Sequence, residues 1–182
     1  MTLKALSEVV QPCSPDLGFL TRHLPGTRTG GQLYARPAQR RPGRPYQVLI
    51  GHGDTVWSHG TLEHMPARAD GNHLRGPGVF DMKAGLTMIV FALQALDALD
   101  LTPPATPVVL VTSDEEIGSF ESKPTIDRLA RGAARAFVLE PALGLEGKLK
   151  TARKGTGEFE ITASTASSQT GPPSEGSAAT IV

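Results

Sequence analysis

The chain has 182 residues, and 18 Lys and Arg residues balance 18 Asp and Glu residues. This neutral charge argues against a protein that binds nucleic acid or a membrane surface, because both favour a positive excess. The single cysteine, Cys13, excludes a disulfide framework and a multi-cysteine zinc site. No signal peptide and no run of about 18 apolar residues is recognised. We therefore expect a cytoplasmic protein with no nucleic-acid or membrane partner.

The first 45 residues carry weak structural signals. Residues 3–10 could form a helix that prolines then interrupt, and residues 32–35 could form a short strand. Four arginines lie among prolines in residues 35–45. This pattern is more typical of an exposed basic loop than of a nucleic-acid patch.

The middle of the chain alternates between predicted strands and helices. Residues 46–51, 107–112 and 134–139 are apolar runs that predict three buried strands. Residues 84–99 predict a helix packed on both sides, and residues 125–132 predict an amphipathic helix. This alternation predicts an α/β fold with a mainly parallel, mixed sheet sandwiched by helices. From residue 148 onward the apolar residues alternate with polar ones, which is typical of a half-exposed antiparallel strand.

Polar side chains follow each of the three predicted strands. The first run ends at His52 and Asp54, the second is followed by Glu115 and Glu116, and the third by Glu140. Sites in parallel sheets form beyond the carboxyl ends of the strands, so we expect these side chains to meet. Nitrogen and carboxylate donors without thiolates suit zinc, with cobalt or manganese as alternatives.

The spacing of these residues along the chain suggests a different role for each of them. His52 and Asp54 project to the same side of an extended segment, so Asp54 can hold one ring nitrogen while the other binds a metal. Adjacent Glu115 and Glu116 point to opposite sides, so one can bind a metal and the other can act as a general base. Asp81 lies on its own loop before a helix and could be shared by two cations.

Five motifs occur in one order along the chain: HGDTVW, GPGVFDMKAG, TSDEEIGSFES, VLEP and RKGTGEFEIT. Through them the chain from Tyr46 to Val182 resembles the M20 metallopeptidase family, most closely its glutamate carboxypeptidase (carboxypeptidase G2-like) branch. The resemblance implies the amino-terminal part of a zinc-peptidase catalytic domain over residues 1–150. It also implies the start of an α+β lid or dimerisation domain over residues 151–182, through which a complete chain could form a homodimer.

The resemblance also implies an activity and a set of ligands. The expected metal ligands are His52, Asp81, Glu116 and Glu140, which would hold two zinc ions with Asp81 between them. The implied reaction is hydrolysis of an amide bond by metal-activated water. The substrate would be a small peptide or an N-acyl amino acid, and the product a C-terminal amino acid such as glutamate.

The two remaining site residues have implied roles in catalysis. Asp54 would orient His52, and Glu115 would be the general base that later protonates the leaving nitrogen.

The sequence also departs from the family pattern. The family takes a second histidine ligand from near its carboxyl end, whereas none of the five histidines here lies after residue 73. Ser168 or Gln169 stands where the family has a histidine that stabilises the oxyanion. Two hypotheses follow. The chain is a zinc-dependent amidohydrolase, either a carboxypeptidase or a related N-acyl amino acid deacylase, or it is a catalytically inactive, truncated remnant with partial metal binding.

Overall fold

The computed structural model describes residues 18–39, 42–152 and 154–155. The helix predicted over residues 3–10 lies outside them, as do Ser168, Gln169 and most of the alternating segment after residue 148. The chain divides into two units, Met1–Lys148 and Leu149–Val182. All helices and strands of the described residues belong to the first unit. The domain boundary predicted at residue 150 stays a prediction.

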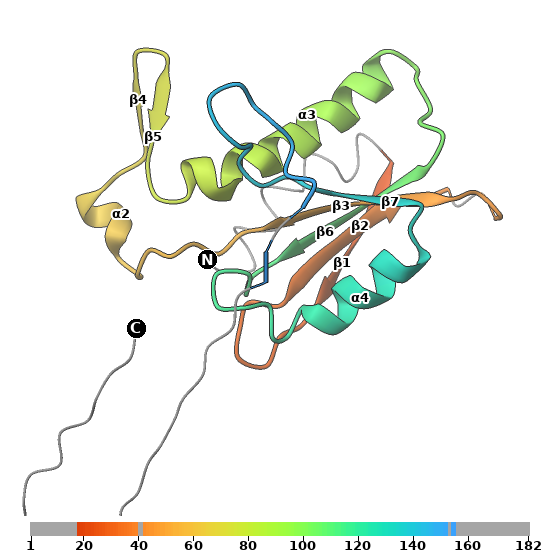
Figure 1. Cartoon of the computed structure of the whole chain (residues 1–182), viewed down its shortest axis with the longest axis horizontal. Coiled ribbons are helices and arrows are strands. Elements are labelled where there is room, and N and C mark those ends of the chain that lie inside the picture. Colours follow the sequence, from red (N-terminus) through yellow and green to blue (C-terminus); the bar gives the residue numbers. More distant parts are fainter. Residues whose placement is uncertain (1–17, 40–41, 153, 156–182) are drawn as a thin grey trace, which may run out of the picture. The chain divides into compact units, whose positions relative to one another are not determined.

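A five-stranded mixed sheet forms the centre of the first unit (Figure 1). In spatial order its strands are β1 (Phe19–Leu24), β2 (Gln32–Pro37), β6 (Thr106–Thr112), β3 (Tyr46–His52) and β7 (Arg135–Val138). Strand β3 is parallel to both β6 and β7, whereas β2 is antiparallel to both β1 and β6. The predicted α/β class with a mixed sheet is confirmed. Its parallel part consists of the three strands that the sequence predicted.

Two helices cover opposite sides of this sheet, α3 (Ala84–Ala98) and α4 (Lys123–Gly132) (Figure 1). The main core lies between α3 and the sheet, where Leu86, Ile89 and Leu93 join apolar side chains of β1, β2 and β6. Burial of each such side chain contributes about 1.5–3 kcal/mol. The α3 face toward the sheet thus fixes one layer of the fold.

The prediction that this helix packs on both sides is wrong. On the far side of α3, Met88 is 61% and Phe91 is 66% exposed. The segment Val79–Ala98 is also long and apolar enough to cross a membrane by length and composition, contrary to the expectation that no such segment exists. Packing against the sheet accounts for the apolar residues on its inner face, which are buried in the core.

The prediction that residues 134–139 form a buried strand is also partly wrong. Strand β7 forms, but all four of its residues are exposed, including Phe137 at 45% and Val138 at 59%. It lies at the edge of the sheet and pairs with β3 among the described residues. An apolar run predicts a strand with neighbours on both sides, whereas its burial depends on which neighbours are present.

The polar stretch between β3 and α3 holds three short elements that no pattern in the sequence predicts. Helix α2 (Thr61–His64) is followed by the hairpin of β4 (Arg68–Asp70) and β5 (His73–Arg75). An ion pair between Arg75 Nε and Asp70 Oδ2, 3.0 Å apart, spans this hairpin. Each element has four or fewer residues, too short to show a period in its sequence.

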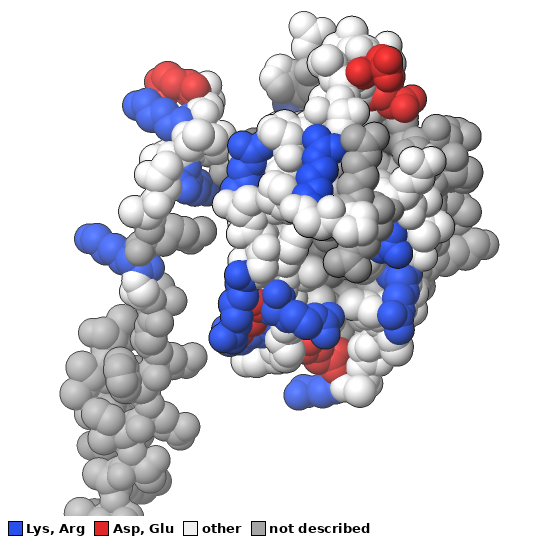
Figure 2. Space-filling model, turned by 90° about the vertical axis from the view of Figure 1, so that its right-hand side faces the viewer, with Lys and Arg blue, Asp and Glu red and all other residues white. Residues whose placement is uncertain are grey.

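Basic residues do not gather into one patch on the face seen in Figure 2. Lys and Arg side chains stand there in separate groups with uncharged surface between them. Two arginines of the predicted basic loop bind backbone oxygens instead: Arg36 donates to Pro37 and Arg44 donates to Pro103, each at 2.8 Å. Arg44 therefore links two distant segments of the chain, whereas the bond of Arg36 is local. Arg36 lies within β2 rather than in a loop.

Candidate metal centre

The three parallel strands bring their carboxyl ends to one edge of the sheet. In the β3–β6 register His52 lies opposite Thr112, two residues before Asp114. In the β3–β7 register Ile50 lies opposite Val138, so His52 is level with the position of Glu140. The predicted meeting of these strand ends is therefore a direct consequence of parallel pairing.

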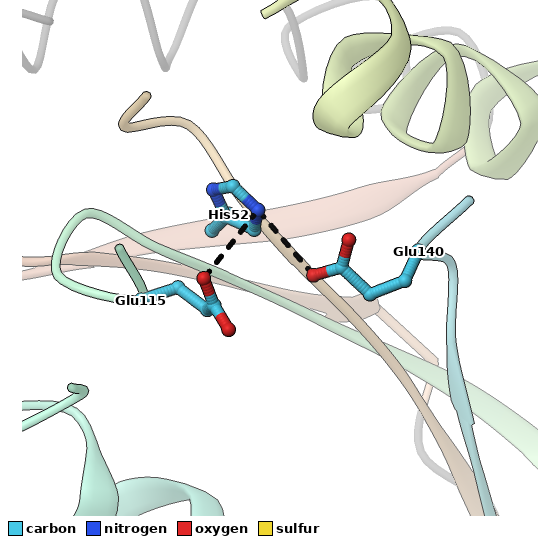
Figure 3. A group of neighbouring side chains, drawn as sticks. All are labelled: His52, Glu115 and Glu140. Atoms are coloured by element: carbon cyan, nitrogen blue, oxygen red, sulfur yellow. Dashed lines mark ion pairs between the residues drawn. The ribbon is translucent and has the colours of Figure 1, made fainter. Parts of the chain in front are cut away.

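His52 stands at the centre of the cluster and is 1% exposed. Its Nε2 atom is 3.2 Å from Asp81 Oδ1, 3.3 Å from Glu140 Oε1 and 3.8 Å from Glu115 Oε2. Figure 3 shows Glu115 and Glu140 reaching this nitrogen from two sides. One imidazole nitrogen thus faces three carboxylates that come from three separate segments of the chain.

The other ring nitrogen of His52 is held by Asp54. Nδ1 lies 3.0 Å from the backbone carbonyl oxygen of Asp54 and 3.4 Å from its carboxylate Oδ1. The carboxylate Oδ2 accepts a hydrogen bond from the backbone N–H of Glu116 at 3.0 Å. Asp54 therefore contacts the ring as expected, and its nearest contact is the main-chain oxygen rather than the carboxylate.

The adjacent glutamates differ in their surroundings. Glu116 is partly buried, and its Oε1 accepts a hydrogen bond from the backbone N–H of Val56 at 3.2 Å. The side chain of Glu115 is half exposed at the rim of the cluster. The more exposed of the two, Glu115, is therefore the one for which the family resemblance implies a role as general base.

Asp81 is positioned by a short turn before α3. Gly78, with a φ of +66°, precedes the π-helical turn η2 (Val79–Lys83), within which Asp81 itself has non-helical backbone angles. Glycine adopts such a positive φ with little strain, which permits a tight turn before Asp81. Met82 is completely buried, and its sulfur accepts a hydrogen bond from the backbone N–H of His52 at 3.1 Å. This contact anchors the Asp81 turn to the end of β3.

The site residues fall into two overlapping groups that could each hold a metal ion. One group consists of His52, Glu115 and Glu140, and the other of His52, Asp81 and Glu116. Within each group the candidate ligand atoms all lie within 4.8 Å of one another. The structure thus brings all four expected ligands together, and it adds Glu115 to the first group.

The charges of the cluster are unbalanced. The pKa of Glu140 is raised to about 7, chiefly by burial. A hydrogen bond to Asp81 and repulsion from Asp81 and Glu115 raise it further, whereas attraction by His52 lowers it. Burial likewise raises the pKa of Glu115, assisted by neighbouring carboxylates. Burial lowers the pKa of His52. The nearby carboxylate of Asp54, together with those of Glu140 and Glu115, outweighs the effect of burial and raises the pKa of His52 to about 9. A cation would relieve this excess of negative charge.

These residues therefore fit a divalent metal. An imidazole nitrogen with carboxylate oxygens, and no thiolate, is a donor set typical of zinc and tolerated by cobalt or manganese. The Oδ1 atom of Asp54 is buried, makes no regular hydrogen bond and lies 3.4 Å from His52 Nδ1. Its charge there favours a proton on Nδ1 and so leaves Nε2 to bind a metal.

Two further residues contribute, to which the sequence assigned no separate role. Lys83 lies near the carboxylates of Asp54, Asp81 and Glu116, and burial lowers its pKa against their attraction. Asp114 is 1% exposed, and its Oδ2 accepts hydrogen bonds from the backbone N–H groups of two residues further along its loop, at 2.8 and 2.9 Å. The sequence offered one indication of their involvement, which is that each lies within two residues of a predicted ligand.

Comparison with curated proteins gives relatives over most of the chain. The chain is 32% identical over 114 residues to carboxypeptidase G2 of Pseudomonas sp. (strain RS-16), a match that covers 63% of this chain and 28% of that protein. It is 33% identical over 161 residues to succinyl-diaminopimelate desuccinylase of Gluconobacter oxydans (strain 621H), covering 80% of this chain and 40% of that protein. The chain thus spans less than half the length of these relatives.

Solved structures share the fold. The M20 family metallo-carboxypeptidase Sso-CP2 from Sulfolobus solfataricus matches 80% of this chain and 33% of its own length, with a TM-score of 0.59 and 20% identity. Human carnosine dipeptidase 1 matches 75% of this chain and 31% of its own length, with a TM-score of 0.58 and 17% identity. Residues 48–179, which include every site residue described above, match the sequence pattern of Peptidase family M20/M25/M40. The resemblance seen in the motifs is confirmed, and the chain belongs to this peptidase family.

Proposed function

We propose that this chain carries the metal-binding part of a zinc-dependent hydrolase that cleaves an amide bond and releases a C-terminal amino acid such as glutamate. The observation that carries the proposal is the convergence of three carboxylates on His52 Nε2, at 3.2 to 3.8 Å. Packing alone would not collect three carboxylates around one imidazole, because like charges at this separation repel one another.

Residues of both overlapping groups would hold the zinc. His52 and Glu140 would hold one ion, Glu116 would hold a second, and Asp81 would serve both. Support comes from the two groups of ligand atoms, which separate Glu140 from Glu116 and have His52 in common. Bound zinc would supply Lewis-acid polarisation of the substrate carbonyl and a water of lowered pKa. Asp54 would keep the His52 ring in the orientation that leaves Nε2 free.

Glu115 is the residue best suited to move the proton. Its side chain is half exposed and stands 3.8 Å from His52 Nε2, so it can reach both the cluster and a substrate at its rim. Its raised pKa favours a group that accepts a proton from water and returns it to the leaving nitrogen. The reaction balances without a further reactant, since water supplies a hydroxyl to the carbonyl carbon and a proton to the amine.

A second candidate is an N-acyl amino acid deacylase. It is favoured by the match to a protein named succinyl-diaminopimelate desuccinylase, and by 35% identity over 109 residues to one named acetylornithine deacetylase, from Pectobacterium carotovorum subsp. carotovorum (strain PC1). A third candidate is a catalytically inactive remnant with partial metal binding. It is favoured by the candidate ligand groups of the described residues, in which His52 is the one histidine.

The test combines metal content with hydrolysis. The purified chain is loaded with zinc and dialysed, and zinc per chain is measured together with cleavage of N-acylglutamates and N-acetylornithine. We expect Glu115→Gln to lower turnover by about 10²–10⁴-fold while zinc remains bound. The exposed Glu63 provides the matched control, Glu63→Gln, which should change neither quantity. One weakly bound zinc with no turnover would instead establish the remnant, and turnover of acetylornithine alone would establish the deacylase.

A further inference from the structure

The loop that carries Glu115 and Glu116 has little apolar packing of its own. It covers residues 113–122, between the end of β6 and the start of α4. Its large apolar side chains, Ile117 and Phe120, are 60% and 76% exposed, so burial of apolar surface contributes little to its position. The position of the loop, and with it that of the two glutamates, therefore depends on hydrogen bonds.

The strongest set of these hydrogen bonds is made by Glu121. Its carboxylate reaches the turn between β1 and β2, 92 to 94 residues away along the chain. There it accepts hydrogen bonds from the backbone N–H groups of Thr27, Arg28 and Thr29, at 3.0, 2.8 and 3.2 Å. The hydroxyl groups of the two threonines also donate to it. One side chain near the end of the loop is thus held by three backbone and two hydroxyl donors.

The turn is shaped around this carboxylate. Successive backbone N–H groups that point to one centre form a concavity that binds anions. Gly26 closes the concavity, since a Cβ atom there would lie 2.7 Å from Glu121 Oε2 and 2.7 Å from the backbone oxygen of Thr29. A carboxylate has only acceptors and suits such a site, whereas an amide would turn its own NH₂ donors toward the N–H groups.

The start of the loop is fastened to the same turn. Ser113 Oγ donates a hydrogen bond to the backbone oxygen of Gly31 at 2.8 Å. The next residue, Asp114, is buried, and its Oδ2 accepts from the backbone N–H groups of the last two loop residues, at 2.8 and 2.9 Å. Both ends of the loop are therefore tied to each other and to the β1–β2 turn, and Glu115 directly follows Asp114.

We propose that Glu121 is a positioning residue, which anchors this loop so that Glu116 binds a metal and Glu115 transfers a proton. Glu121 acts through the loop, since the partners of its carboxylate all lie in the β1–β2 turn. The roles of Glu115 and Glu116 rest on the proposed function, whereas the anchoring of the loop rests on the hydrogen bonds of Glu121.

Hydrogen exchange of the metal-free chain tests the anchoring. The backbone N–H groups of Glu116, Gly118 and Ser119 each donate a hydrogen bond that holds the loop in shape. In Glu121→Gln we expect these amides to exchange at least about tenfold faster relative to the central amides of β6, because the loop opens locally. Equal acceleration of the loop and of β6, or no acceleration, would overturn the proposal, because Glu121 would then affect overall stability alone.

Zinc affinity and turnover test the effect on the site. Isothermal titration calorimetry should show that Glu121→Gln binds zinc about tenfold more weakly, because Glu116 is no longer held in place. At saturating zinc we expect kcat to fall by about 10–100-fold with a smaller change in KM, because a displaced Glu115 transfers the proton more slowly. A variant with faster loop exchange but unchanged zinc affinity and kcat would overturn the role in positioning.

Variants of the turn provide a matched test. Thr29→Val removes one hydroxyl donor to Glu121, keeps the shape of the side chain and lies outside both the loop and the metal centre. It should reproduce the effects of Glu121→Gln at smaller size, and it should add little when the two changes are combined. Full additivity of the two changes would overturn the proposal, since the residues would then act separately. The control Glu63→Gln, on the exposed α2, should alter none of these quantities.

The results separate this inference from the proposed function. A parent chain that binds no zinc and cleaves no amide, together with faster loop exchange in Glu121→Gln, would overturn the proposed function and leave the anchoring by Glu121 standing. A parent chain that binds zinc and cleaves the amide, together with a Glu121→Gln variant that matches it in loop exchange, zinc affinity and kcat, would do the reverse.

Discussion

The carboxylate of Asp54 accepts a hydrogen bond from the backbone N–H of Glu116 at 3.0 Å, although 62 residues separate the two along the chain. In return, Glu116 Oε1 accepts a hydrogen bond from the backbone N–H of Val56 at 3.2 Å. These reciprocal contacts join the loop after β3 to the loop after β6. They fix the distance between His52 and the adjacent glutamates, on which both the metal site and the proton transfer depend.

Asp54→Asn should therefore weaken zinc binding without breaking the loop contact. The asparagine oxygen still accepts from Glu116, but the negative charge beside His52 Nδ1 is lost. We expect zinc affinity to fall by about 10–100-fold, as for other groups that orient a metal-binding histidine. Isothermal titration calorimetry measures it, with Asp70→Asn on the exposed β4–β5 hairpin as control. Unchanged affinity in Asp54→Asn would show that the backbone oxygen alone orients the ring.

Zinc binding should release protons, and more of them at lower pH. In the metal-free chain the pKa of His52 is raised to about 9 and that of Glu140 to about 7. Both groups must lose their proton to bind a metal. We expect release of about two protons per zinc at pH 6 and about one at pH 8. Calorimetry in buffers of different ionisation enthalpy counts them, and a number independent of pH would contradict the assignment.

Glu121 should make the stability of the fold depend on acidic pH. Hydrogen bonds from the hydroxyls of Thr27 and Thr29, with backbone N–H groups of Thr27 and Arg28, lower its pKa from 4.5 to about 2. The unfolded chain binds this proton more readily than the folded chain does. The stabilisation is therefore complete above pH 4.5 and is lost as the pH falls to about 2.

Glu121→Gln tests this dependence. Urea unfolding should show a variant less stable than the parent chain at pH 7, because an amide NH₂ replaces one of two acceptor oxygens. The difference in stability between the variant and the parent chain should disappear as the pH falls from 4.5 to 2. The control Glu63→Gln, on the exposed α2, should follow the parent curve throughout. A difference in stability that stays constant across this pH range would mean that the charge of the Glu121 carboxylate does not contribute to stability.

The sequence predicted which side chains lie together better than it predicted which side chains are buried. His52, Glu115 and Glu140 were found because each follows an apolar run by only a few residues, and parallel pairing turns that local pattern into proximity. The roles of Lys83 and Asp114 depend on which groups fold against them, and no local pattern contains that information.

The misjudged surfaces of β7 and α3 have a related cause. An apolar residue in a strand or helix indicates that its burial would be favourable. Whether it is buried depends on whether another element of the fold packs against it. Phe137 and Phe91 are both apolar and exposed for this reason. Strand β1 was not predicted at all, because FLTRHL mixes polar and apolar residues without strict alternation, and four of its six residues are exposed.

The exposed face of α3 should cause self-association. Met88, Phe91 and, on β7, Phe137 and Val138 leave large apolar side chains in contact with solvent. Apolar surface of this kind promotes association. Dynamic light scattering should show concentration-dependent particles, and Phe91→Lys should reduce them, whereas Gln94→Lys on another exposed position of α3 should reduce them less. A monodisperse monomer for the parent chain would contradict the prediction.

Gly85 should couple the packing of α3 to the metal centre. A Cβ atom at this position would collide with the backbone carbonyl oxygen of Leu139, the residue before Glu140. Because alanine favours a helix over glycine by about 1 kcal/mol, Gly85→Ala would stabilise α3 if there were room. The collision with backbone cannot be relieved by rotating a side chain, so we expect a net loss of about 1–3 kcal/mol, as for overpacking in a core.

The same displacement should reach the ligands. Moving Leu139 shifts Glu140 away from His52 Nε2, now 3.3 Å from it, so zinc affinity should fall together with stability. Urea unfolding and zinc titration measure the two effects, and Ala92→Ser on the exposed side of α3 is the matched control, with little change in either. A variant that loses stability but binds zinc as tightly as the parent chain would show that Glu140 holds its place independently of α3.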